Sequence, residues 1–112
     1  KIEFAGVDIE PEKLEIAASY IDVDNKLITL LTNRKLNISS LSMDDFILSG
    51  AGYYKSSSDE VKYDDKSITI KLRNELNSNE ELLIEITSPG RGRIKDHNNQ
   101  ELSTAEIVLK TN

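Results

Sequence analysis

The amino-acid sequence predicts an all-β protein, a sandwich of about seven antiparallel strands joined by Greek-key connections. Three observations support this fold class. Short segments with an apolar residue at every second position recur along the chain. Polar turns separate these segments roughly every eight to twelve residues, as is typical of sandwiches. No helical period persists beyond one turn, so helices do not alternate with strands as they would in an α/β sheet.

The clearest element is a β-hairpin across residues 60–73. One alternating run ends at an acidic break, residues 64–66, and a second alternating run follows it. Two such runs around a short turn predict a hairpin with one buried and one solvated face. The residues that share a face are Val61 and Tyr63 in the first run and Ile68, Ile70 and Leu72 in the second.

Five further segments predict strands by the same alternation. They are residues 14–23, 26–33, 45–49, 82–87 and 104–111. The second is apolar on both faces, which is typical of a strand in the middle of a sheet. The expected inward residues, in chain order, are Ile16, Ala18, Tyr20, Ile28, Leu30, Phe46, Leu48, Leu82, Ile84, Ile86, Ala105, Ile107 and Leu109.

The connections between these strands are polar and rich in turn-forming residues. Residues 39–43 predict a single helical turn, because Ser and Asn favour turns and helix caps. Residues 53–55, after a glycine-containing break, are a candidate for a short edge strand. Leu76, Ile94 and Leu102 are expected to anchor the longer connections to the core.

Length and composition predict one small domain and exclude several functions. Of the 112 residues, 1–13 are interpreted as a leading segment or linker and 14–112 as the domain, with Pro11 marking the boundary. The net charge of -6 argues against a nucleic-acid partner, because phosphate binding needs a basic surface. No apolar run is long enough to insert into a membrane. The chain has no cysteine, which fits a cytosolic protein or a Gram-positive surface protein.

Several short motifs resemble the Ig-like repeats of bacterial surface proteins. They are Asp24-Asn25-Lys26 before Leu-Ile-Thr-Leu, the Ser-Leu-Ser-Met-Asp-Asp-Phe segment that ends at Phe46, and the Ile94–Leu102 stretch. The chain is most similar to repeats associated with swimming motility and to the Ig-like modules of S-layer proteins, from about Ile16 to Leu109. It departs from them in the final loop, where Asn98-Asn99 replaces the usual glycine.

This resemblance implies an Ig-like sandwich that is a structural or adhesive module, not an enzyme. It implies a place as one repeat of a larger bacterial cell-surface or secreted protein. The implied partners are neighbouring domains of the same chain and a cell-wall or host glycan or protein.

Acidic and amide residues gather in predicted turns and form a candidate calcium site. In a seven-strand sandwich, Asp64 and Asp65 lie at the same pole as Asp96 and Asn98, and calcium prefers such oxygen ligands. The alternative is that these residues only form turns, which their side chains favour. Calcium is the only cofactor predicted, because the single histidine, His97, has no cysteine or second histidine to complete a zinc site.

Tyr53 and Tyr54 form a candidate ligand-binding site beside a glycine-containing loop. Adjacent exposed aromatic rings can stack on a sugar, so the alternative function is a carbohydrate-binding accessory module of a secreted enzyme. The competing interpretation is that one tyrosine covers the core while the other has no specific role. No pairing of a nucleophile with a base is readable in the sequence, so no catalytic residue is predicted.

Overall fold

The computed structural model describes residues 13–86 and 94–111. Residues 1–12, most of the predicted leading segment, lie outside this described part. No helix in the described ranges is long and apolar enough to cross a membrane. The elements are β2 (Ile16–Asp22), β3 (Leu27–Thr32), the 3-10 helix η1 (Met43–Asp45), β4 (Phe46–Gly50), β5 (Glu60–Tyr63), β6 (Ser67–Lys71), β7 (Glu81–Ile86) and β8 (Glu106–Lys110).

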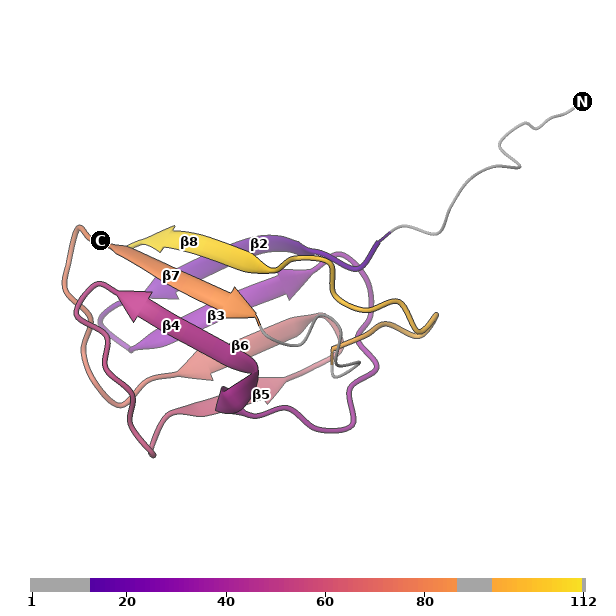
Figure 1. Ribbon diagram of the computed structural model, residues 1–112, viewed down its shortest axis with the longest axis horizontal. Helices are drawn as coiled ribbons and strands as arrows, with labels where there is room; N and C mark the ends of the chain where they lie inside the picture. The colour runs from indigo at the N-terminus through magenta and orange to yellow at the C-terminus, as the bar shows by residue number, and fades with distance from the viewer. Residues whose placement is uncertain (1–12, 87–93, 112) are drawn as a thin grey trace, which may run out of the picture.

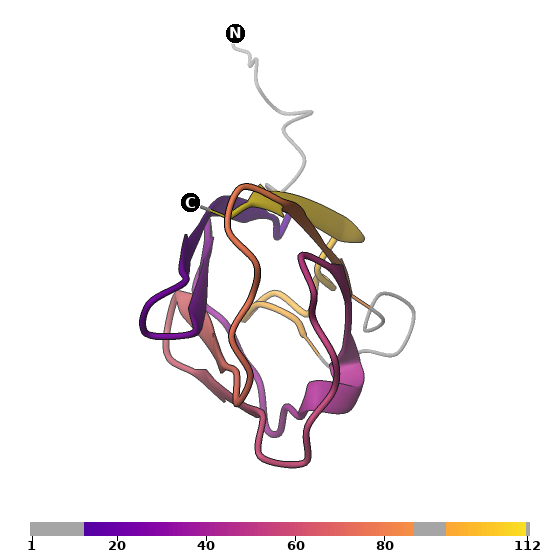
Figure 2. The same ribbon diagram turned by 90° about the vertical axis from the view of Figure 1, so that its left-hand side faces the viewer.

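The strands form two antiparallel sheets that pack face to face (Figures 1 and 2). One sheet has the order β2-β3-β6-β5 and the other has the order β4-β7-β8. Named A to G along the chain, the strands fall into ABED and CFG, which is the order of the constant-type immunoglobulin sandwich. The predicted fold class is therefore confirmed.

The core lies between the two sheets and is built from the alternating residues of their inner faces. Because side chains in a strand point alternately to the two faces, every second residue of the central strands is buried. This confirms the inward residues predicted for β3, β4, β6 and β7. The buried residues of these strands are Ile28, Leu30, Phe46, Leu48, Ile68, Ile70, Leu82, Ile84 and Ile86.

Apolar residues from the connections cover the ends of the core. Leu76, Ile94 and Leu102 are buried, as predicted for loop anchors. Leu14 is also fully buried and forms an isolated parallel bridge with Leu102 before β2 begins. The segment before β2 and the connection between β7 and β8 therefore meet at one end of the sandwich.

The faces predicted for the first strand are only partly correct, because β2 contains a β-bulge. The pairing of β2 with β3 shifts register between Ile16 and Ala18. An extra residue reverses the side-chain alternation beyond it. Ile16 packs against the core as predicted, but Ile21 joins it and Tyr20 is 58% exposed. The prediction that Tyr20 faces inward is wrong, since the alternation alone does not reveal the extra residue.

β4 is bounded by a capped helical turn and by a glycine. The Ser42 hydroxyl accepts a hydrogen bond from the Asp44 amide, and Asp45 Oδ2 accepts one from the Ser42 amide at 3.0 Å. Together these interactions form a capping box around η1. The predicted turn therefore forms a few residues later than expected. At the other end, Gly50 has a φ of 91°, and a side chain there would collide with the Glu81 carbonyl oxygen. The candidate edge strand at residues 53–55 is not a strand.

Candidate functional site

The residues predicted to bind calcium lie at one pole of the sandwich, as the strand order requires. Leu36 connects the two turns, because its amide donates to the Asp65 carbonyl at 2.6 Å and its backbone pairs with Asp96. Asp64 and Asp65 are exposed, and Asp64 Oδ1 accepts the amide of Asp65 at 2.8 Å. The structure therefore brings both predicted turns to the same end of the molecule (Figure 1).

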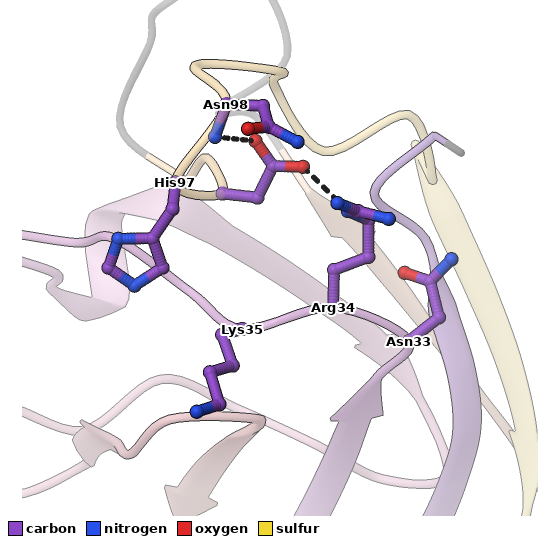
Figure 3. Close-up of a pocket in the computed structure, with 6 residues that line it drawn as sticks. Asn33, Arg34, Lys35, His97 and Asn98 are labelled. Atoms are coloured by element: carbon purple, nitrogen blue, oxygen red, sulfur yellow. Dashed lines mark hydrogen bonds and ion pairs between the residues drawn. The ribbon is translucent and has the colours of Figure 1, made fainter. Parts of the chain in front are cut away.

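Asp96 is the organising residue of this pole. Its Oδ1 atom accepts hydrogen bonds from the amides of Asn98 at 2.8 Å and Gln100 at 2.9 Å. Its Oδ2 atom accepts a hydrogen bond from Nε of Arg34 at 3.1 Å, and Figure 3 draws this bond and the one from Asn98 as dashed lines. The Asp96 side chain is only 1% exposed, whereas that of Arg34 is 30% exposed. Burial raises the pKa of Asp96, but the hydrogen bonds from Gln100, Asn98 and Arg34 outweigh burial and hold this pKa below its ordinary value.

The cleft beside Asp96 is polar and carries charges of both signs. Its volume is about 310 Å³, and Figure 3 shows its lining residues. No group of three or more Asp, Glu, His or Cys side chains that could hold a metal occurs within residues 13–86 and 94–111. Both oxygens of Asp96 are already used by protein donors. Calcium binding stays a prediction. The lining residues are Asn33, Arg34, Lys35, Asp96, His97 and Asn98.

Asp22 and Asn25 form a turn at the opposite pole. Asp22 Oδ1 accepts the Asn25 amide at 3.1 Å, and its Oδ2 accepts the Asn25 side-chain amide at 2.8 Å. The side-chain hydrogen bond, followed by the backbone one, lowers the pKa of Asp22. This pair shows the turn chemistry that is the alternative to metal binding for such residues.

Tyr53 and Tyr54 have different environments. The Tyr53 hydroxyl donates to Asp59 Oδ2 at 3.0 Å, and the ring packs against the core. Asp59 is itself buried and accepts the amides of Ser56 at 3.1 Å and Arg73 at 2.8 Å. Burial, together with the Asp59 carboxylate, raises the pKa of Tyr53 to about 12. Tyr54 is 65% exposed. One tyrosine therefore fixes a loop on the core, while the other faces solvent.

The segment that leads into β2 is held by the side chain of Asn33, at the end of β3. Asn33 Oδ1 accepts the Glu15 amide at 2.8 Å, and Asn33 Nδ2 donates to the Lys13 carbonyl at 2.8 Å. The Asn33 amide donates to the Glu15 carbonyl at 3.1 Å. One residue thus makes three hydrogen bonds to the incoming chain.

The same segment is also held from the other sheet. The amide and hydroxyl of Ser103 donate to the Leu14 carbonyl at 2.8 and 2.9 Å. Thr104 Oγ1 accepts the Ile16 amide at 3.0 Å. We call Asn33, Ser103 and Thr104, with the segment of residues 13–16 that they hold, the N-terminal clasp.

A second set of hydrogen bonds holds the chain where it leaves β8. The Thr111 amide donates to the Glu80 carbonyl at 2.8 Å, the Glu80 amide donates to Thr111 Oγ1 at 3.0 Å, and the Thr111 hydroxyl donates to the Asn77 carbonyl. The Asn79 amide donates to the Thr111 carbonyl at 3.0 Å. We call Thr111 and the loop of residues 77–80 the C-terminal clasp.

The two clasps lie at opposite poles of the sandwich (Figure 1). Sequence reasoning missed both, because Asn33 and Thr111 carry no signal beyond their position at strand ends. Their partners are separated by at least 18 residues, and no local spacing indicates such contacts.

No family model matches the chain, and no curated protein or solved structure matches it.

Proposed function

We propose that this domain is a non-catalytic structural or adhesive Ig-like module of a larger bacterial cell-surface or secreted protein. The observation that carries the proposal is that hydrogen bonds hold the chain to the folded domain at two opposite poles, in the N-terminal clasp and in the C-terminal clasp. A module that receives the chain at one end and releases it at the other can be joined in an extended row. The clasps keep each junction attached to a folded core.

The relative direction of the first and last strands supports a load-bearing role. β2 and β8 run side by side in the same direction, and Leu14 and Leu102 form a parallel bridge at their start (Figure 1). A pull on Lys13 and Thr111 in opposite directions therefore slides one strand past the other. The hydrogen bonds of the N-terminal clasp join these two strands at their starts and would oppose this sliding.

The bacterial and extracellular location rests on the resemblance to surface repeats, and the lack of cysteine is compatible with a Gram-positive surface protein. A domain without disulfides depends on its core and its hydrogen bonds for stability. The sandwich supplies such a core, with seventeen buried apolar residues in the described part of the chain.

The alternative, a carbohydrate-binding accessory module, has weaker support. A sugar-stacking platform needs exposed aromatic faces. Tyr53 instead packs against the core, and its hydroxyl donates a hydrogen bond to Asp59. Tyr54 is therefore the exposed member of the pair.

Small-angle X-ray scattering of two copies of the chain joined end to end tests the structural role. We expect a maximum dimension close to the sum of two copies in a row. The matched control carries a long Gly-Ser linker between the copies, which frees the junction. A tandem as compact as two copies lying side by side would refute the proposal. Labelling of intact cells of the source organism with an antibody against the domain tests the location.

A further inference from the structure

The outer edge of β4 lacks the charged residues and prolines that usually discourage pairing with another strand. β2 and β8 adjoin each other through the N-terminal clasp, so their edges are partly covered. β5 carries two exposed charged residues, Glu60 and Lys62, and charges on an edge discourage pairing. β4 has the sequence Phe-Ile-Leu-Ser-Gly, with no charge and no proline. Within the described residues no strand pairs with its outer edge.

A hollow of about 220 Å³ runs along this edge. Phe46, Ile47 and Leu48 all line it, although successive residues of a strand point to opposite faces. Residues of both faces can line one hollow only when it lies along the edge of the strand. Its remaining lining residues are Met43, Asp44, Tyr53 and Lys55.

The walls of the hollow are mostly apolar and are held in place. Met43 and Tyr53 pack against the core, and the hydrogen bond to Asp59 fixes the Tyr53 ring. At the rim, Lys55 Nζ lies 3.7 Å from Asp44 Oδ1, with both side chains largely exposed. Such a surface ion pair contributes little and opens easily. The volume suits one aliphatic or aromatic side chain and is smaller than a typical small-molecule pocket.

We propose that β4 binds an extended segment of a partner protein as an added strand, with one apolar side chain of that segment in the hollow. Main-chain hydrogen bonds to a free strand edge supply affinity in this mode, and an adjacent pocket supplies specificity. The inference rests on the adhesive part of the proposed function and names its partner as a polypeptide.

The charges beside β4 define the partner further. On the outer face Ile47 lies opposite Glu85, and Glu85 lies opposite Glu106 of β8. Like charges directly opposite each other destabilise a strand pair, and neither glutamate has an ion-pair partner in the described part of the chain. The outer face beside the β4 edge is therefore acidic, and it favours Lys or Arg at the outward positions of the added strand, where their long side chains extend over Ile47 towards Glu85. A second copy would bring the same acidic face and the same net charge of -6.

A displayed library of random nine-residue peptides, selected against the intact domain, tests the proposal. We expect the enriched peptides to alternate apolar residues with Lys or Arg and to shift the amide resonances of β4. The two test variants are Ile47→Arg and Val108→Arg. Both residues are about half exposed on the outer face of the same sheet, but only Ile47 lines the hollow. Affinity should fall at least about tenfold in Ile47→Arg and remain unchanged in Val108→Arg.

Three results would overturn the proposal. One is the lack of any enriched alternating peptide, and another is equal loss of binding in the two variants. The third is a dimer of the unliganded domain that Ile47→Arg dissociates, which would make a second copy the occupant. None of these results changes the extension of the tandem in scattering, so the structural role and the binding edge are tested separately.

Discussion

Ser103 directs two donors, its amide and its hydroxyl, to the carbonyl oxygen of Leu14, at 2.8 and 2.9 Å. The two residues are 89 positions apart in the chain. Leu14 precedes β2, in one sheet, and Ser103 precedes β8, in the other. A single carbonyl therefore joins the first strand to the last and one sheet to the other, at the pole where the chain arrives.

Replacing Asn33 with alanine should weaken the N-terminal clasp. The substitution removes both side-chain hydrogen bonds, to Lys13 and Glu15, and we expect it to lower the free energy of unfolding by about 1–2 kcal/mol in urea denaturation. The matched control is Asn37→Ala, because the exposed Asn37 side chain makes no hydrogen bond in the described part of the chain. Equal losses of stability in the two variants would contradict a stabilising role for the Asn33 side-chain hydrogen bonds.

The Asp96→Ala substitution should destabilise the domain by about 2–3 kcal/mol, because it leaves the amides of Asn98 and Gln100 and the guanidinium of Arg34 without their acceptor. Asp65→Ala is the control, since Asp65 is exposed and its carboxylate makes no hydrogen bond in the described ranges. Urea denaturation at neutral pH compares the two variants. A similar small loss in both would contradict the role assigned to Asp96.

The same carboxylate should make stability depend on acid. The pKa of Asp96 lies lower in the folded state than its ordinary value of 3.8, so the unfolded chain takes up the proton first as the pH falls. The stabilisation is present above about pH 4 and is lost as the pH falls through the lowered pKa. The difference in unfolding free energy between the native protein and Asp96→Asn should therefore shrink below pH 4. A difference that stays constant across this range would contradict the lowered pKa.

Tyr53 should govern stability at alkaline pH. Its pKa is raised to about 12 in the folded state, against an ordinary value of 10.0. Because the neutral phenol is favoured in the folded state, its contribution is complete below pH 10 and is lost as the pH rises towards 12. Absorbance titration should show one tyrosine ionising near pH 12 that is missing in Tyr53→Phe. Identical high-pH titration steps in the two proteins would rule out this assignment.

The interpretation of the acidic residues as turn formers predicts that calcium leaves the melting temperature unchanged. Both oxygens of Asp96 already accept hydrogen bonds, and no three acidic or histidine side chains converge in the described part of the chain. Thermal unfolding with millimolar calcium and with a chelator measures this directly. A ligand that binds only the native state must raise the midpoint. A rise of several degrees would therefore support the predicted calcium site at Asp64, Asp65, Asp96 and Asn98.

The fold was predictable from the sequence because its main signal is local. Alternation in β3, β4, β6 and β7 gives the buried faces directly, since each inner residue is two positions from the next. The signal fails at Tyr20, where a bulge inserts one residue and leaves the local pattern unchanged. It also fails at the clasps, because Asn33 and Ser103 act on residues that only the folded topology brings near.

The site residues show the same division. The strand order correctly placed Asp65 and Asp96 at one pole, but it could not show that Arg34 would pair with Asp96 from 62 positions away. Likewise, the neighbouring Tyr53 and Tyr54 look equivalent in the sequence. Only the fold brings Asp59 to one of them.

Single-molecule pulling along the axis between the two poles tests the load-bearing role most directly. The chain has no cysteine, so handles can be attached at Lys13→Cys and Lys110→Cys, or at Lys13→Cys and Lys66→Cys for a comparison axis. We predict a higher unfolding force along the 13–110 axis, which slides β2 past β8, than along the 13–66 axis. Asn33→Ala should lower the 13–110 force and Asn37→Ala should not. Equal forces along both axes, or no effect of Asn33→Ala, would contradict the account.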